Sequence, residues 1–136
     1  MSILCTSHLK KYYGKDESLV RALDDINVSI EKGQFAAIIG TSGSGKSTLL
    51  HMLGGLDRPT SGSIQVENNS LETMREEELA VFRRRRVGFV FQNYNLIPYL
   101  TAYENIVLPV RLDGKIEDKK FFGENHRFSG IRRETF

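Results

Sequence analysis

The sequence predicts an α/β fold built around a phosphate-binding loop, preceded by an antiparallel β-rich segment. Residues 40–48 read Gly-Thr-Ser-Gly-Ser-Gly-Lys-Ser-Thr and fit the pattern G-x-x-x-x-G-K-[ST] without deviation. An apolar run at residues 35–39 predicts a buried strand before the loop, and leucines at helical spacing predict a helix over residues 47–53. Alternating polar and apolar residues at 26–30 and 63–67 predict half-exposed strands.

The chemistry of this loop is the binding of phosphate. Glycines let the backbone approach an anion closely, and the N–H groups of the loop and of the next helical turn point at it. Lys46 supplies a charge for the β- and γ-phosphates, and the Ser47 hydroxyl is a ligand for Mg²⁺. A glycine-rich turn without a ligand is the alternative, and the lysine and hydroxyls at the right offsets disfavour it. The residues expected to contact the nucleotide are Gly40, Ser42, Gly43, Ser44, Gly45, Lys46, Ser47 and Thr48.

The remaining elements follow in order along the chain. Residues 59–62 form a turn, and residues 75–86 have acids first and bases last, which suits a helix dipole. Residues 87–91 predict a second buried strand that leads into a loop over residues 92–100. Thr101 and Glu104 form a capping box that opens a helix, which is perturbed at Pro109.

Composition limits the class of protein. A chain of 136 residues is one domain's worth, and its net charge of +2 is too small to predict a nucleic-acid partner. The run of four arginines at residues 83–86 reads either as a solvated helix end or as a site for an anionic partner. Cys5 is the single cysteine, which excludes an intrachain disulfide. The sequence carries no secretory signal and no membrane span, so we expect a cytoplasmic chain that docks on a membrane protein.

Residues 9–120 resemble the nucleotide-binding subunit of an ATP-binding cassette (ABC) transporter. The resemblance is carried by residues 40–50, by Leu-Asp-Arg-Pro-Thr-Ser-Gly at 56–62 and by residues 87–98. Leu-Thr-Ala-Tyr-Glu-Asn-Ile at 100–106 favours the lipoprotein-releasing and macrolide-exporter type, with bacteriocin and peptide exporters as close relatives. The resemblance implies a P-loop NTPase fold over residues 1–120, followed by a divergent, weakly structured tail at 121–136.

The resemblance also implies roles for individual residues. Tyr13 matches the aromatic that stacks on adenine, whereas the spacing of Tyr12 is wrong by one; an ordinary strand tyrosine is the alternative. Gln92 matches a glutamine that reaches Mg²⁺ and senses the attacking water; a loop glutamine that caps a strand is the alternative. Apolar residues 96–100 suit either docking to a membrane partner or local packing.

Three family motifs for hydrolysis are missing from the 136 residues. These are the Asp-Glu pair after an apolar run (Walker B), the signature Leu-Ser-Gly-Gly-Gln and the switch histidine; Ser129-Gly130 resembles the signature at two positions only. We therefore expect the N-terminal portion of a truncated domain and leave its ATPase activity open. Strands 35–39 and 87–91 would lack partners, so we expect marginal stability, aggregation or dependence on a partner.

The expected function is an ATP-binding subunit of an ABC export system, with ATP and Mg²⁺ as cofactors. The resemblance implies that two such subunits dimerise around nucleotide and couple hydrolysis to a membrane permease at the inner face of the membrane. Two alternatives stay open. One is a non-catalytic chain with weak or no nucleotide binding, and the other is a soluble ABC protein without a membrane partner.

Overall fold

The computed structural model describes residues 2–116. The chain divides into two compact units, the first ending at Val87 and the second beginning at Gly88. The phosphate-binding loop and the sheet belong to the first unit.

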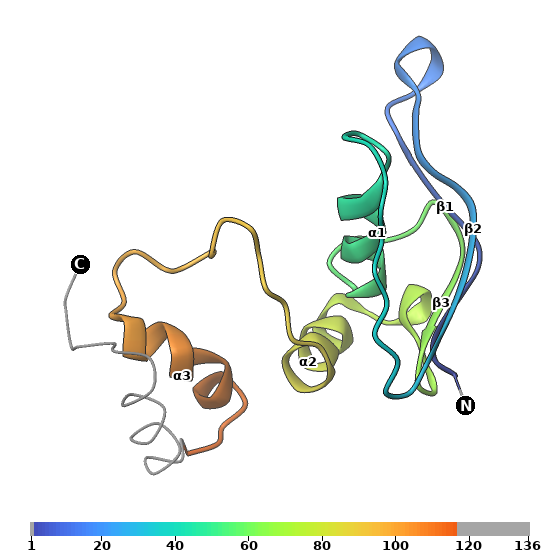
Figure 1. The fold of residues 1–136 in the computed structure, drawn as a ribbon. Coiled ribbons are helices and arrows are strands. Elements are labelled where there is room, and N and C mark those ends of the chain that lie inside the picture. Colours follow the sequence, from blue (N-terminus) through green and yellow to red (C-terminus); the bar gives the residue numbers. More distant parts are fainter. Residues whose placement is uncertain (1, 117–136) are drawn as a thin grey trace. The chain divides into compact units, whose positions relative to one another are not determined.

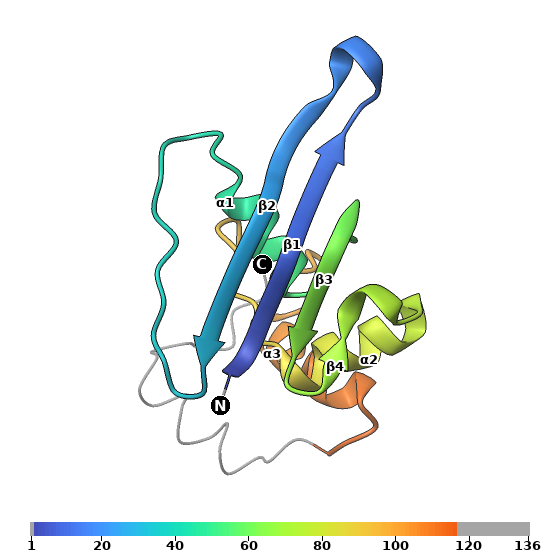
Figure 2. The same ribbon diagram turned by 90° about the vertical axis from the view of Figure 1, so that its right-hand side faces the viewer.

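A four-stranded antiparallel sheet forms the frame of the first unit. β1 (Ser2–Tyr13) and β2 (Val20–Glu31) form a long hairpin, joined through the short 3-10 turn η1 (Asp16–Ser18). β3 (Ser61–Val66) pairs with the other edge of β1, and β4 (Asn69–Ser70) pairs with β3, giving the order β2-β1-β3-β4 (Figure 2). The expected antiparallel β-rich N-terminal segment is thereby confirmed.

One face of this sheet is covered by helices (Figure 1). α1 (Lys46–Leu53) and α2 (Glu76–Arg86), together with η2 (Leu71–Thr73), contribute apolar side chains that pack on those of the strands. Each fully buried leucine contributes about 1.5–3 kcal/mol by removal from water, so this shared core holds α1 against the sheet. The core consists of Leu9, Leu23, Leu49, Met52, Leu53, Ile64, Leu71, Leu79 and Phe82.

Both helices of the first unit confirm the sequence predictions. α1 ends where two glycines follow, and the Gly54 N–H donates to the Leu50 carbonyl at 3.0 Å. Gly55 has a φ of 67°, a conformation that glycine adopts without strain. α2 has Glu76 to Glu78 in its first turn and arginines in its last, as the dipole argument requires.

The prediction of buried strands at residues 35–39 and 87–91 is wrong, because neither segment forms a strand in the structure. Residues 35–39 run through a long irregular connection between β2 and α1, with Phe35 94% and Ile39 90% exposed (Figure 2). Residues 87–91 are also irregular, with Val90 fully exposed. A strand buried on both faces requires hydrogen-bonded neighbours and covering elements. The sheet within residues 2–116 provides no such neighbour for either segment.

In the second unit, the described residues 88–116 include a loop and α3 (Ala102–Leu112). The capping box is confirmed, because the Glu104 N–H donates to Thr101 Oγ1 at 3.2 Å and the Thr101 N–H donates to Glu104 Oε2 at 2.8 Å. α3 continues through Pro109 for three further residues. The tail predicted at residues 121–136 lies outside the described residues. Within residues 2–116, no helix combines the length and apolar character needed to cross a bilayer.

Candidate phosphate-binding site

The phosphate-binding loop enters α1 through a position that only glycine fits. Gly45 is the N-cap of α1 and has a φ of 83°. A Cβ at this position would lie 2.3 Å from the Ala22 carbonyl oxygen and 3.2 Å from Leu23 Cδ2. The absence of a side chain therefore lets the loop lie directly against β2. This contact fixes where α1 begins.

The start of α1 offers backbone donors to an anion. The first N–H groups of a helix have no carbonyl one turn earlier to accept from them, and the helix dipole is positive at this end. Lys46, Ser47 and Thr48 form this first turn, and Leu49 anchors it in the core. The Ser47 side chain is exposed beside these donors. A phosphate group is the ligand that this combination fits.

Lys46 folds back across the loop. Its Nζ donates to the Thr41 carbonyl oxygen at 2.5 Å and to Ser44 Oγ at 3.3 Å. Both acceptors are neutral, so phosphate oxygens can replace them with a gain in charge complementarity. The structure thus brings Lys46, Ser44 and the first turn of α1 together, as the sequence predicts. Ser42 and Gly43 form the exposed tip of the same loop.

Tyr13 lies beside the first turn of α1. Its hydroxyl donates to Asp57 Oδ2 at 3.0 Å and also interacts with the side chain of Thr48. Burial and the hydrogen bond to Asp57 together raise the pKa of Tyr13 above its ordinary value. The residue as a whole is 43% exposed. Tyr13 therefore meets the phosphate-binding helix while staying partly exposed.

Tyr12 faces the other way, as alternation along a strand requires. Its hydroxyl donates to Asp24 Oδ1 at 2.5 Å, and the guanidinium of Arg21 lies 5.5 Å from its ring centroid. Tyr12 and Tyr13 thus have separate partners. Of the two tyrosines, Tyr13 is the one that contacts α1.

Asp57 is a site residue that sequence reasoning missed. Its Oδ1 accepts from Lys11 Nζ at 2.8 Å and from the Arg58 N–H at 2.7 Å, while Oδ2 accepts from Tyr13. Desolvation acts to raise the pKa of Asp57, but these hydrogen bonds outweigh it and hold the pKa below its ordinary value. No spacing rule connects Asp57 with Tyr13, because 44 residues separate them. The proline and glycine nearby indicated only a turn.

Gln92 lies in the second unit, in the exposed loop that precedes α3. Its expected place beside Mg²⁺ remains a prediction. In the same loop Leu96 is 59% and Tyr99 96% exposed. The Asn105 side chain braces this loop: its Oδ1 accepts from the Ile97 N–H, and its Nδ2 donates to three carbonyls, those of Ile97, Leu100 and Thr101.

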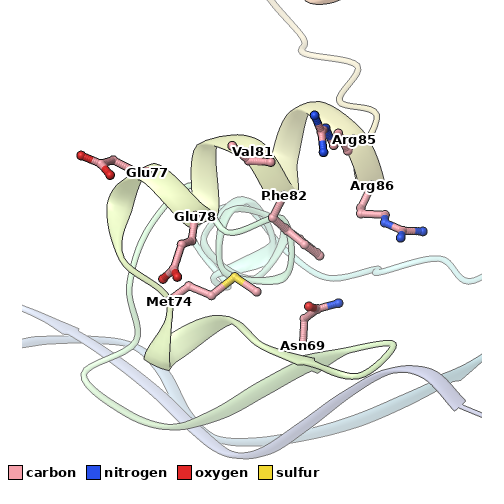
Figure 3. A pocket seen from close by; sticks show the side chains of 8 residues that line it. All are labelled: Asn69, Met74, Glu77, Glu78, Val81, Phe82, Arg85 and Arg86. Atoms are coloured by element: carbon pink, nitrogen blue, oxygen red, sulfur yellow. The ribbon is translucent and has the colours of Figure 1, made fainter. Parts of the chain in front are cut away.

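A separate groove of about 440 Å³ lies over α2 (Figure 3). Glutamates lie toward one end, arginines toward the other, and Phe82 points into the groove between them. No residue of the phosphate-binding loop lines it. Two arginines of α2 have partners in the first unit, since Arg83 donates to the Gly55 carbonyl at 2.6 Å and Arg86 pairs with Glu67 at 3.6 Å. These contacts favour a structural role for them. The lining residues are Asn69, Met74, Glu77, Glu78, Val81, Phe82, Arg85 and Arg86.

A glycine-rich loop that leads a lysine into a helix N-terminus is the phosphate-binding arrangement of P-loop proteins. Comparison with known proteins gives the family of the chain. Residues 23–134 match the ABC transporter family, and the chain belongs to it. This match extends past residue 120, while the division between domain and tail remains a prediction.

Among curated relatives, the chain is 50% identical over 109 residues to the macrolide export ATP-binding/permease protein MacB of Neisseria gonorrhoeae, covering 80% of this chain and 17% of MacB. It is 42% identical over 124 residues to the bacitracin export ATP-binding protein BceA of Halalkalibacterium halodurans, covering 89% of this chain and 49% of BceA. The chain therefore spans half or less of these relatives' length. It is homologous to the ATP-binding domains of export systems.

A solved structure agrees with this assignment. The ATP-binding cassette MJ0796 of Methanocaldococcus jannaschii, solved as a dimer in a post-hydrolysis state with ADP and Pi, matches with a TM-score of 0.80 at 39% identity. The match covers 87% of this chain and 51% of that one.

Proposed function

We propose that this chain binds ATP through residues 40–48 as the ATP-binding domain of an ABC export system. The observation that carries the proposal is the geometry of the loop. Gly45 lets the backbone lie against β2, the first turn of α1 offers its N–H groups, and Lys46 reaches back across the loop to neutral oxygens. Relatives named for macrolide and bacitracin export and for ATP binding support the export role.

Different residues of the chain would contact different parts of MgATP. The N–H groups of the loop and of the first turn of α1 would donate hydrogen bonds to the phosphates. Lys46 Nζ would leave the Thr41 carbonyl and Ser44 Oγ and donate to oxygens of the β- and γ-phosphates instead. Ser47 would ligate Mg²⁺, which supplies charge neutralisation between the phosphates when bound. Tyr13 would stack on adenine, and Gln92 would serve Mg²⁺ and the attacking water, as the resemblance to the family implies.

Assembly follows from the same proposal. Two copies would pair around nucleotide, in line with the dimeric cassette found in the comparison. The exposed apolar loop at residues 96–100 would face a membrane permease, with the domain on the cytoplasmic side of the membrane. Exposed apolar side chains suit such a docking surface.

The test is an equilibrium titration of MgATP into the 136-residue chain and two lysine variants. Lys46→Ala removes the charge-assisted contacts to phosphate, which are worth about 1.5–3 kcal/mol each, so we expect affinity to fall about tenfold or more. Lys32→Ala is the matched control, because Lys32 is an exposed lysine in the turn after β2. Equal affinity for MgATP in the wild type and Lys46→Ala would overturn the proposal.

A second variant separates the metal from the phosphates. Ser47→Ala keeps Lys46 and the backbone donors, so ATP without Mg²⁺ should bind as in the wild type. Binding of MgATP should be weakened. The opposite pattern would remove Ser47 from the metal site.

A further inference from the structure

The side chains of Lys11 and Tyr13, at the end of β1, form a cluster with that of Asp57, which follows α1. Lys11 is 13% exposed, and its Nζ donates to Asp57 Oδ1 at 2.8 Å and to the Arg58 carbonyl at 2.7 Å. The same Nζ lies 4.9 Å from the ring centroid of Tyr13. The Tyr13 hydroxyl donates to the second oxygen of Asp57. Asp57 thus holds both the tyrosine and the cation that covers it.

The cluster leaves the Tyr13 ring with one occupied face. A cation within about 6 Å of a ring centroid interacts with the face of the π-system. A purine base also stacks on a ring face, so the face over Lys11 is closed to it. Tyr13 is nevertheless 43% exposed as a residue, which leaves surface for a base. A base that stacks on Tyr13 must therefore use the face opposite Lys11.

The hydroxyl contacts fix how this ring is turned. Asp57 Oδ2 and the Thr48 side chain both engage the Tyr13 hydroxyl. Thr48 belongs to the first turn of α1, and Asp57 lies just after that helix. The ring and the phosphate-binding helix are therefore tied into one frame. That frame sets the position of a stacked base relative to the phosphates.

We propose that Asp57 and Lys11 are positioning residues that hold Tyr13 as a one-sided platform for the base of the nucleotide. This inference rests on the proposed ATP binding. It adds two residues that do not touch the phosphates and act only through Tyr13. Their removal must therefore weaken a ligand that carries a base and spare one that does not.

The chain contains a matched control on the other face of the sheet. Tyr12 has an aspartate partner, Asp24, and a cation over its ring, Arg21. The chemistry is that of the Lys11, Tyr13 and Asp57 cluster, and these contacts do not include α1. Asp24→Ala therefore removes a tyrosine–aspartate contact of the same kind away from the site.

The experiment measures the affinity of ATP and of inorganic tripolyphosphate for the wild-type chain, Asp57→Ala, Lys11→Met and Asp24→Ala. Base stacking on an aromatic side chain is worth about 1–3 kcal/mol, so we expect Asp57→Ala and Lys11→Met to weaken ATP about fivefold or more. Tripolyphosphate should bind all four proteins equally. Asp24→Ala should bind both ligands as the wild type does.

The outcomes separate the two proposals. A wild-type chain that binds neither ligand overturns the proposed ATP site and this inference with it. A wild-type chain that binds both, with Asp57→Ala and Lys11→Met indistinguishable from Asp24→Ala toward ATP, overturns the inference alone. Equal weakening of ATP and tripolyphosphate also overturns it, because the two residues would then act on the phosphate loop. Should Asp57→Ala fail to fold, Lys11→Met carries the same test.

Discussion

Gly45 is the residue whose replacement most directly tests how the phosphate-binding loop is built. Gly45→Ala introduces a Cβ at a φ of 83° and at 2.3 Å from the Ala22 carbonyl oxygen. A left-handed conformation costs an L-residue about 1–2 kcal/mol. Crowding of a packed site costs about 1–3 kcal/mol more. We therefore expect a loss of about 2–5 kcal/mol in the free energy of unfolding.

Gly33→Ala is the control that measures the cost of the left-handed backbone conformation without crowding of the added Cβ. Gly33 has a φ of 81°, and a Cβ there would meet nothing within 4 Å. Its expected cost is about 1–2 kcal/mol. Urea unfolding followed by circular dichroism measures both variants against the wild type, and a variant already unfolded without urea counts as the upper limit. Equal losses in the two variants would refute the argument that the loop must lie against β2.

Four further predictions concern the second unit and the chemistry. Thr101→Ala should cost about 1 kcal/mol and raise amide exchange in the first turn of α3 about fivefold. The pKa of Glu104 lies below its ordinary 4.5 because the N–H and hydroxyl of Thr101 donate to its carboxylate. The cap should therefore persist above pH 4.5 and be lost as the pH falls through the lowered pKa. Amide exchange in α3 that does not depend on pH across this range, once corrected for intrinsic rates, would contradict this. Asn105→Asp retains an acceptor for the Ile97 N–H and loses the donors to Ile97, Leu100 and Thr101, so exchange at residues 97–101 should rise; unchanged exchange would show that the loop does not depend on Asn105. Phosphate release from MgATP by the 136-residue chain should stay at background, since the sequence lacks an Asp-Glu pair after an apolar run; turnover that Lys46→Ala abolishes would contradict this.

Local signals in the sequence predict the structure well. The helix after the glycine loop, its end at Gly54 and the capping box at Thr101 each depend on residues within one or two turns of each other. The antiparallel β-rich segment predicted before the loop is also local, because a short turn joins β1 to β2, although the sequence does not predict the bounds of β1. These elements are confirmed for that reason.

Pairing between distant segments is what the sequence does not determine. The apolar runs at residues 35–39 and 87–91 have the composition of buried strands, yet a strand also requires a neighbour. The described residues form an antiparallel sheet that leaves both runs unpaired, and Phe35 and Val90 are exposed. This exposure agrees with the expected marginal stability, which cooperative thermal unfolding of a soluble monomer would contradict.

The residues of the candidate site also differ in whether a local sequence signal predicts them. The pattern of residues 40–48 predicts the loop by itself, and the resemblance to the family, through the spacing to Ala22 and Leu23, favours Tyr13 over Tyr12. Asp57 has no such signal, whereas Lys11 lies two residues before Tyr13 on β1 and therefore on the same face. The relation of Asp57 to Lys11 and Tyr13 depends on β1 lying beside the turn that follows α1. Only the folded chain brings them together.

The central claim is that residues 40–48 bind the triphosphate of a nucleotide. The most direct measurement is ³¹P NMR of ATP titrated with the wild-type chain and with Lys46→Ala. The account predicts that the β- and γ-phosphate resonances shift and broaden with the wild-type chain, and that Lys46→Ala reverses most of this change. Resonances that respond equally to both proteins, or to neither, would contradict it.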